Sequence, residues 1–249
     1  MNKGYKLAFC KKEWYNKGMK VFAIGDLHLS FSADKPMDIF GGNWEGHFEK
    51  IKADWLQKVT PEDVVLIPGD ISWAMKLSCA EKDLAQIATL PGQKVFIRGN
   101  HDYWWNGIGK LRAVAPDSTF HFLQTDGVKI GNFVFVGSRG WTCPGSPDFT
   151  EQDQKLYLRE AERFRLAFTE AKKLMEEGDT LVALIHYPPF TLKNEETLFT
   201  EIFEKEGVDT AVFGHLHGPT YFPLKTQKRG VNYVLSSCDK VGFSLVRVY

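Results

Sequence analysis

The chain has 249 residues, 43% of them apolar and a quarter charged, so its composition is that of a globular protein long enough to bury a sizeable core. Its 31 basic and 31 acidic residues cancel, which argues against general nucleic-acid binding through a global positive field. No segment has the roughly 20 apolar residues of a membrane-spanning helix, so we expect no membrane partner.

The cysteines and the N-terminus bear on location and domain organisation. The four cysteines are widely spaced and form no CxxC pair, which predicts reduced thiols in a cytoplasmic protein rather than a disulfide framework or a zinc site. We find no Pro/Ser-rich linker, so we expect a single domain over residues 1–249. Residues 1–18 could be an extension, because Met19 directly precedes the first strong strand. Their basic stretch lacks the apolar run of a secretory signal.

Five short apolar runs, taken in chain order, each lead into an abrupt polar turn. The runs span residues 21–24, 64–67, 95–97, 181–185 and 211–213. The turns that follow contain Gly25-Asp26-Leu27-His28, Pro68-Gly69-Asp70, Gly99-Asn100-His101-Asp102, His186-Tyr187-Pro188-Pro189 and Gly214-His215-Leu216-His217. Continuous apolar runs of this length suit strands that helices or a second sheet bury on both faces.

Helical patterns lie between these runs. One apolar stripe recurs at helical spacing and stops before a proline that disfavours continuation: Trp44, Phe48, Ile51 and Trp55, then Pro61. A longer stripe over residues 157–175 predicts a helix that covers a sheet or, alternatively, forms a dimer interface. Residues 119–137 predict a hairpin-like pair of strands. Residues 221–249 predict further strands with a turn at residues 228–230.

Alternating strands and helices place the chain in the α/β class. In such folds ligands bind outside the carboxyl ends of the strands, where all five polar turns lie. Five distant segments could therefore converge on one site. The side chains that they would bring there are Asp26, His28, Asp70, Asn100, His101, His186, His215 and His217.

Mixed carboxylate, imidazole and amide donors suit borderline divalent metals such as Mn, Fe, Zn, Co or Ni. Eight side chains are too many for one ion but suit two. Asp70 stands alone in its turn, which favours a carboxylate that bridges both ions. The glycines of these turns, at positions 25, 69, 99 and 214, would let the chain approach the ions closely. His47 and His121 fall outside the set and are interpreted as ordinary surface or core residues.

The ordered set Asp-x-His, Gly-Asp, Gly-Asn-His-Asp, a lone His after a strand, and Gly-His-x-His resembles the signature of calcineurin-like metallophosphoesterases, from about Met19 to about Pro219. The resemblance implies a metallo-dependent phosphatase-like fold, a four-layer α/β/β/α sandwich of two mixed β-sheets flanked by helices. It implies that one metal is held by Asp26, His28, Asp70 and His217, and a second by Asp70, Asn100, His186 and His215. It makes His101 the acid/base residue rather than a ligand.

The expected activity is two-metal hydrolysis of a phosphomonoester or phosphodiester, on a small phosphorylated or nucleotide-type substrate. Two dications offset by Asp26, Asp70 and a bridging hydroxide leave a positive centre that attracts a phosphoester anion. A protonated His101 would donate to the leaving oxygen, and Asp102 could orient a neighbouring group. The alternatives are a phosphoprotein phosphatase of the Ser/Thr type and a non-catalytic scaffold, although a scaffold has no need of His101.

Several residues near these turns could contact substrate. Arg98 and Arg139 could hold phosphate, and Trp141 could stack under a base or sugar. Arg98 could equally form a surface ion pair, and Trp104 and Trp105 are interpreted as packing residues. Long segments at residues 30–42 and 141–151 also separate the motifs, and the second, which is rich in Gly and Pro, could form a rim or lid. Fold alone does not identify the substrate.

Overall fold

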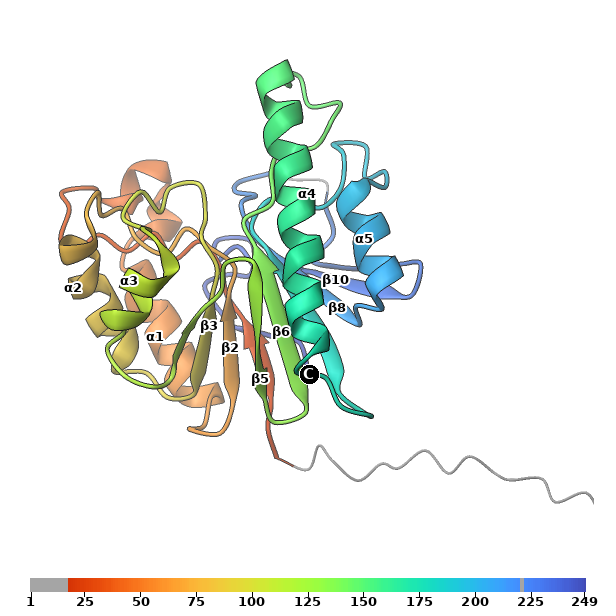
Figure 1. Cartoon of the computed structure of the whole chain (residues 1–249). Helices are drawn as coiled ribbons and strands as arrows, with labels where there is room; N and C mark the ends of the chain where they lie inside the picture. Colours follow the sequence, from red (N-terminus) through yellow and green to blue (C-terminus); the bar gives the residue numbers. More distant parts are fainter. Residues whose placement is uncertain (1–17, 220–221) are drawn as a thin grey trace, which may run out of the picture.

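Two β-sheets lie face to face at the centre of the computed structural model, which describes residues 18–219 and 222–249 (Figure 1). The proposed extension at residues 1–18 therefore falls, except for Gly18, outside the described residues. The first sheet has the order β11-β1-β2-β3-β4, and its strands are β11 (Val246–Arg247), β1 (Val21–Ala23), β2 (Val64–Ile67), β3 (Gln93–Phe96) and β4 (Phe120–Phe122). They run parallel except β11, which is antiparallel to β1.

The second sheet has the order β5-β6-β7-β8-β10-β9. Its strands are β5 (Asp126–Ile130), β6 (Phe133–Ser138), β7 (Thr180–Ile185), β8 (Thr210–Phe213), β10 (Val231–Leu235) and β9 (Lys225–Lys228). The four central strands are parallel, and β5 and β9 pair antiparallel at the two edges. The five apolar runs are thus β1, β2, β3, β7 and β8, all of them inside sheets.

Alternate residues of the central strands face opposite ways because side chains alternate along a strand. One set fills the space between the sheets and includes Val21, Ala23, Val64, Leu66, Phe133, Phe135, Val182 and Leu184. The other set faces the helices and includes Phe22, Val65, Ile67, Val134, Ala183 and Ile185. Burial on both faces explains why these strands have continuous apolar sequences rather than alternating ones.

Helices cover the outer face of each sheet (Figure 1). The first sheet is covered by α1 (His47–Lys58), α2 (Leu77–Ala88) and α3 (Ile108–Ala113), and the second by α4 (Glu151–Lys172) and α5 (Leu198–Glu206). The helix α4 begins at a capping box in which Thr150 and Asp153 each accept the other's backbone N–H. Its apolar stripe packs on the second sheet, so the sheet-covering interpretation holds. The expected four-layer α/β/β/α sandwich is confirmed.

The stretch at residues 119–137 differs from the expected single hairpin. Its first part, β4, belongs to the first sheet and runs parallel to β3, and only β5 and β6 form a hairpin. The physical reason is aromatic packing: the rings of Phe120 and Phe122 stack on Phe96, with centroids 5.2 and 5.1 Å away. The chain therefore crosses from one sheet to the other between β4 and β5.

Two short 3-10 turns precede α1, η1 (Met37–Phe40) and η2 (Gly42–Trp44). They lie in the long segment between β1 and α1. Among the described helices, none combines the length and the apolar character that crossing a bilayer requires.

Candidate metal centre

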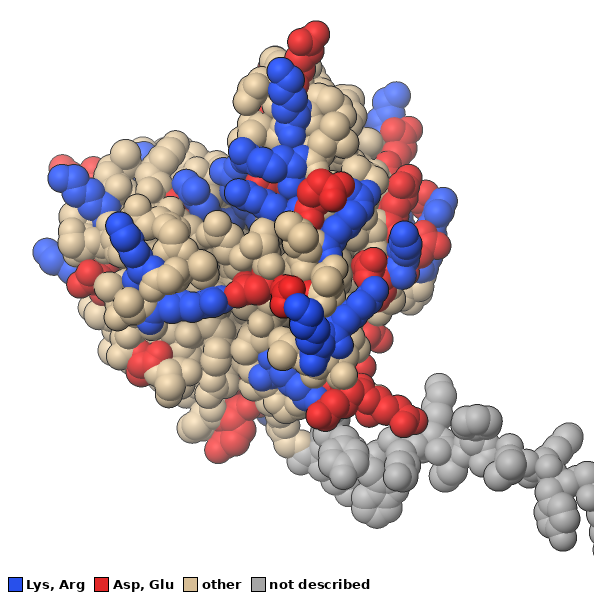
Figure 2. Space-filling view, in the orientation of Figure 1, with Lys and Arg blue, Asp and Glu red and all other residues tan. Residues whose placement is uncertain are grey.

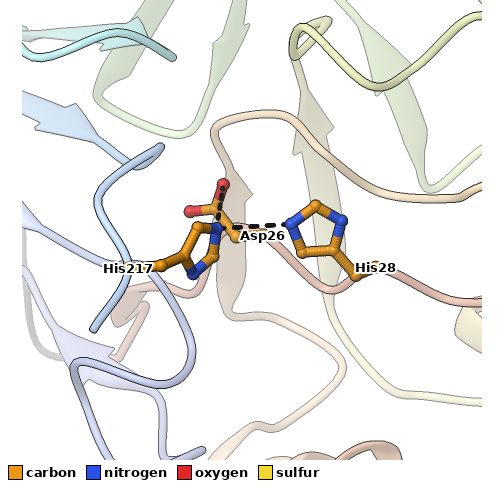
Figure 3. A group of neighbouring side chains, drawn as sticks. All are labelled: Asp26, His28 and His217. Carbon is orange, nitrogen blue, oxygen red and sulfur yellow. Dashed lines mark hydrogen bonds and ion pairs between the residues drawn. The ribbon is translucent and has the colours of Figure 1, made fainter. Parts of the chain in front are cut away.

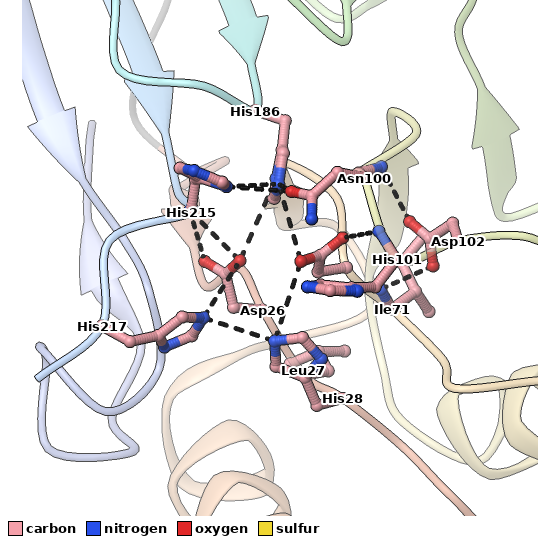
Figure 4. A network of polar contacts seen from close by, with 12 residues as sticks. Asp26, Leu27, His28, Ile71, Asn100, His101, Asp102, His186, His215 and His217 are labelled. Carbon is pink, nitrogen blue, oxygen red and sulfur yellow. Dashed lines mark hydrogen bonds and ion pairs between the residues drawn. The ribbon is translucent and has the colours of Figure 1, made fainter. Parts of the chain in front are cut away.

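The turns after β1, β2, β3, β7 and β8 meet where the carboxyl ends of the two sheets come together (Figure 4). The first sheet supplies the residues up to position 101, and the second supplies the rest. All eight side chains that the sequence singled out lie in this one place: Asp26, His28, Asp70, Asn100, His101, His186, His215 and His217.

Asp26, His28 and His217 form one cluster of ligand-type atoms (Figure 3). The Nε2 atoms of His28 and His217 lie 3.3 Å apart, and His217 Nε2 lies 3.8 Å from Asp26 Oδ1. Two nitrogens that bind one ion at about 2.0–2.1 Å with a tetrahedral angle lie about 3.3 Å apart. The spacing of the two imidazoles therefore fits a shared metal ion.

A second cluster lies beside it and includes Asn100, His186 and His215. Asn100 Oδ1 lies 2.7 Å from His186 Nε2 and 2.9 Å from His215 Nδ1, and these two nitrogens are again 3.3 Å apart. Asp70 faces both clusters, because its Oδ2 lies 3.8 Å from His28 Nε2 and 3.6 Å from His186 Nε2. That is the position expected of a carboxylate shared by two ions.

The imidazoles are held in the form that a metal requires. The Nδ1–H of His186 donates to the Pro68 carbonyl at 2.9 Å, which leaves its Nε2 lone pair facing the second cluster. Burial lowers the pKa of His186 to about 3 and that of His215 to about 2, so both rings are neutral at neutral pH. Metal ligation needs a deprotonated imidazole nitrogen, and these two rings supply it without losing a proton.

The carboxyl groups of Asp26 and Asp70 are buried side by side with little positive charge around them. Burial raises the pKa of Asp26 to about 8; the neighbouring Asp70 raises it as well, while His217 acts in the opposite direction. Burial also raises the pKa of Asp70, against the backbone N–H of His101 that donates to it at 2.8 Å. Two adjacent buried carboxylates stay ionised only beside compensating charge. The donor set and its charge thus fit divalent metal ions.

The backbone of the site is strained at four candidate ligands. Asp26, His28, Asp70 and His215 have φ angles of 57°, 45°, 50° and 71°, in the left-handed region that L residues rarely adopt. Each costs about 1–2 kcal/mol. Half of the eight non-glycine residues with positive φ in the described chain are therefore candidate ligands. Such strain concentrates at functional sites, where the surrounding fold holds it in place.

Two glycines are required by the close approach of neighbouring turns. A Cβ on Gly99 would lie 2.1 Å from Asp70 Oδ1, and one on Gly214 would lie 2.5 Å from Asp26 Oδ2. No side chain fits behind either carboxylate. These positions bear out the expectation that glycine lets the turns close around the site.

His101 lies at the edge of the first cluster, where its ring centroid is 5.7 Å from that of His28 and 4.6 Å from that of Trp73. Asp102, by contrast, lies outside both clusters (Figure 4). It is fully buried and accepts four N–H groups, from Gly99, Ile71, Ser72 and the Trp104 indole. Asp102 therefore fastens the turn after β3 to the turn after β2.

The other sequence candidates lie on the flanks. The Arg139 guanidinium is 4.4 Å from the Trp141 ring centroid, and the Trp141 indole N–H donates to Asp153 at 2.9 Å. Trp104 and Trp105 are buried, as expected of packing residues. His121 forms a hydrogen bond with the Gln93 side chain. His47 forms one with the backbone carbonyl of Leu27, between the candidate ligands Asp26 and His28, so His47 lies beside the site.

Asp239 was missed by reasoning from the sequence. It accepts from His217 Nδ1 at 2.9 Å and from the Gly218 N–H at 3.0 Å, so it orients His217 with Nε2 toward the first cluster. This hydrogen bond, together with Asp26 and Asp70, raises the pKa of His217 although burial acts the other way. A signal was present: residues 233–235 are a short sixth apolar run, and a turn that ends at Asp239 follows it.

A cavity of about 450 Å³ opens beside the first cluster. We call it the aromatic cavity, and its wall contains Met37, Phe40, Asn43, Trp44, Trp73 and the candidate residues His28, His101 and His217. The Trp73 ring stacks on His28 at 4.8 Å, and Lys35 Nζ lies 3.6 Å from the Trp73 ring centroid. The segment between β1 and α1 thus supplies much of the cavity wall.

Comparison with known families finds a match to the calcineurin-like phosphoesterase model over residues 19–219. No curated protein matches the chain. Among solved structures, the phosphopantetheinyl hydrolase of Mycobacterium tuberculosis is similar in fold, with 12% identity and a TM-score of 0.55 over 92% of this chain and 95% of that chain. A protein of unknown function from Aquifex aeolicus is 15% identical with a TM-score of 0.46 over the same shares.

Proposed function

The chain belongs to the calcineurin-like phosphoesterase family and is a metal-dependent phosphoesterase, and we propose that it hydrolyses a small phosphorylated or nucleotide-type substrate at a two-metal centre. The observation that carries this proposal is the meeting of seven ligand-type side chains and one further histidine at the ends of five strands. We also propose that residues 1–249 form one domain. A cytoplasmic location is supported by free thiols at Cys79, Cys143 and Cys238.

The proposed ligands divide between the two clusters. Asp26, His28, Asp70 and His217 would hold one ion, and Asp70, Asn100, His186 and His215 the other. Support comes from the 3.3 Å separation within each pair of imidazole nitrogens and from the place of Asp70 Oδ2 between the clusters. The mixed donors suit Mn, Fe, Zn, Co or Ni. When bound, such ions would activate water and offset negative charge on the phosphoryl group.

The protein's own contribution to bond cleavage would come from His101. Its ring lies beside the first cluster and in the wall of the aromatic cavity, so it can reach a leaving group held there. As a general acid it would donate a proton to the leaving oxygen, a step worth about 10² to 10⁴ in rate. Asp102 is proposed as a positioning residue, since it holds the turn that carries His101 and touches neither cluster.

The aromatic cavity supports a small-molecule substrate. A volume of about 450 Å³ lies within the range of small-molecule sites, and Trp44 and Trp73 offer ring surfaces to a base or another apolar group. Arg98, Arg139 and Trp141 remain proposed substrate contacts on the other flank. A phosphoprotein substrate would present a peptide surface instead, and it serves as the competing outcome of the test.

The proposal is tested by hydrolysis assays on the full chain. We expect activity on p-nitrophenyl phosphate or bis-p-nitrophenyl phosphate that disappears with chelator, returns with Mn²⁺ and accompanies about two metal ions per chain. The faster of the two substrates would identify monoester or diester chemistry. The panel includes a phosphopantetheine diester, because the structurally similar hydrolase is named for that group, and a phosphopeptide.

Asp70→Asn should lose metal and activity together, because the amide cannot bridge two ions with negative charge. The matched control is Asp117→Asn, an exposed carboxylate that accepts from Thr119 far from the site. Metal-loaded protein that hydrolyses nothing in the panel would favour the non-catalytic scaffold. Hydrolysis of the phosphopeptide alone would favour the phosphoprotein phosphatase.

A further inference from the structure

A second, smaller cavity of about 110 Å³ lies at the carboxyl ends of β3 and β6, beside α4. We call it the arginine cavity, because four arginines line it together with Leu123, Gln124 and Ser138: Arg98, Arg139, Arg159 and Arg163. Figure 2 shows lysine and arginine side chains gathered alongside the upper half of α4. Arg98 and Arg139 were expected from the sequence to hold phosphate, and the fold places two further arginines beside them, from one face of α4.

One carboxylate faces these four guanidinium groups. Glu160 is fully buried, and it accepts from Arg163 at 2.7 Å and from the Ser138 hydroxyl at 2.9 Å, while Arg159 lies 3.5 Å away. A single carboxylate cannot balance four positive charges. The cavity therefore carries a local excess of positive charge in a chain whose net charge is zero.

Two of the arginines form no ion pair with another of residues 18–219 and 222–249. Neither Arg98 nor Arg139 joins an ion pair there, and Arg98 Nε is buried with no hydrogen-bond partner. A buried charged donor without an acceptor is costly, so an anion in the cavity would relieve the cost.

The arginine cavity adjoins the candidate metal centre through the backbone. The Arg139 carbonyl accepts the backbone N–H of His186 at 3.0 Å, and Arg98 is two residues before Asn100. Ring contacts continue the connection, since the Trp141 centroid lies 5.4 Å from that of Tyr187 and the Tyr187 centroid 4.3 Å from that of His215. An anion held here would sit beside the second cluster, on the flank away from the aromatic cavity.

We propose that the arginine cavity binds a phosphate group. The volume suits one compact anion rather than a polymer. A guanidinium group can donate two parallel hydrogen bonds to two oxygens of one phosphate. A phosphate dianion also compensates the excess positive charge better than a carboxylate does. The group could be a second phosphate of the substrate, as in a nucleoside diphosphate, and this version rests on the proposed function. It could instead be free phosphate that binds independently of hydrolysis.

The experiment is calorimetric titration of the metal-loaded full chain with inorganic phosphate. Arg98→Gln and Arg159→Gln are compared with Arg165→Gln, a control on the same helix that pairs with Glu162 and does not line the cavity. We expect two phosphate-binding events in the wild type and the control. One of them should weaken about 10- to 100-fold in each test variant, because each loses a charge-assisted hydrogen bond. Two test variants are used so that, if one of them misfolds, the other still tests the proposal.

The source of the phosphate follows from kinetics on the same variants. If the site holds the substrate's second phosphate, the ratio of kcat/KM for a nucleoside diphosphate to that for the monophosphate falls in both test variants. If the site holds free phosphate, the ratio stays constant while the binding event is still lost. Identical isotherms for wild type, Arg98→Gln and Arg159→Gln would overturn the proposal, even in a protein that hydrolyses phosphoesters. If the wild type binds phosphate at the arginine cavity but hydrolyses no phosphoester, the result counts against the proposed function and not against the proposed phosphate site.

Discussion

The two cavities that flank the candidate metal centre differ in almost every physical property. The aromatic cavity, about 450 Å³, is walled by apolar and aromatic side chains and borders the first cluster. The arginine cavity, about 110 Å³, is walled by four guanidinium groups and adjoins the second cluster. An apolar wall selects by surface area and an arginine wall by charge. The two walls would therefore recognise two chemically different parts of one ligand bound at the centre.

The contrast also has an origin in the fold. The aromatic cavity is built by the long segment between β1 and α1, which brings Met37, Phe40 and Trp44 over the ends of the first sheet. Two of the four arginines of the arginine cavity come from α4, a helix fixed to the second sheet by its apolar stripe. A loop can change shape more freely than a packed helix. We therefore expect the aromatic side to adapt to ligands and the arginine side to stay rigid.

The largest effect on this comparison should come from His101→Ala, which removes the proposed general acid from the wall of the aromatic cavity. We expect kcat to fall about 10²- to 10⁴-fold on a substrate with a poor leaving group, because a general acid is lost. Both metals should remain. The control is His121→Ala, whose ring bonds to Gln93 away from the site. Full activity of the variant on that substrate would remove His101 from the proposed mechanism.

A smaller effect is expected from Asp239→Asn, which weakens the hold on His217 where the aromatic cavity meets the first cluster. Loss of the carboxylate that orients a ligating histidine should lower metal affinity about 10- to 100-fold. Metal titration should show that one ion is weakened and the other is not, since His217 belongs to one cluster. Equal weakening of both ions would contradict the division of ligands. Asp117→Asn again provides the control.

The smallest effect should come from Phe40→Ser at the mouth of the aromatic cavity, where the ring is 59% exposed and free to meet a ligand. The value of kcat/KM should fall about 2- to 10-fold for aryl phosphoesters, the usual worth of one aromatic contact. The fall should be less for methyl phosphoesters. Ile39→Ser is the matched control, because the neighbouring Ile39 is also exposed, at 68%, and does not line the cavity. Equal losses for aryl and methyl esters would argue that the cavity does not hold the leaving group.

The sequence was informative about the centre for a simple physical reason. Strands buried on both faces must be continuously apolar, so a polar turn at the end of one, such as that holding Asp70, stands out. Parallel strands then bring their carboxyl ends to one edge, which is why residues as distant as Asp26 and His217 could be expected together. Asp239 also follows an apolar run at the end of a strand, so it could have been expected at the site on the same grounds.

What the sequence did not predict depended on packing between segments. The strand β4 left the expected hairpin because Phe120 and Phe122 stack on Phe96, a contact that no local pattern encodes. The helices α3 and α5 went unnoticed because they have only six and nine residues. The helix α2 also went unnoticed, although it is as long as α1. The arginine cavity needed the register of α4 against β6 to place Arg159 and Arg163 near Arg98. Side chains from separate elements meet only once the layers are assembled.

The strained turns at the candidate ligands have a consequence for the life of the protein in the cell. A chain that holds Asp26, His28, Asp70 and His215 in left-handed backbone, with two carboxylates crowded together, is less stable without metal than with it. Ions that bind only the folded state return that stability by mass action. In a metal-starved cell more of the chain would be open to proteases, and its abundance would fall. The amount of this protein would then follow the metal supply before any loss of catalysis is measured.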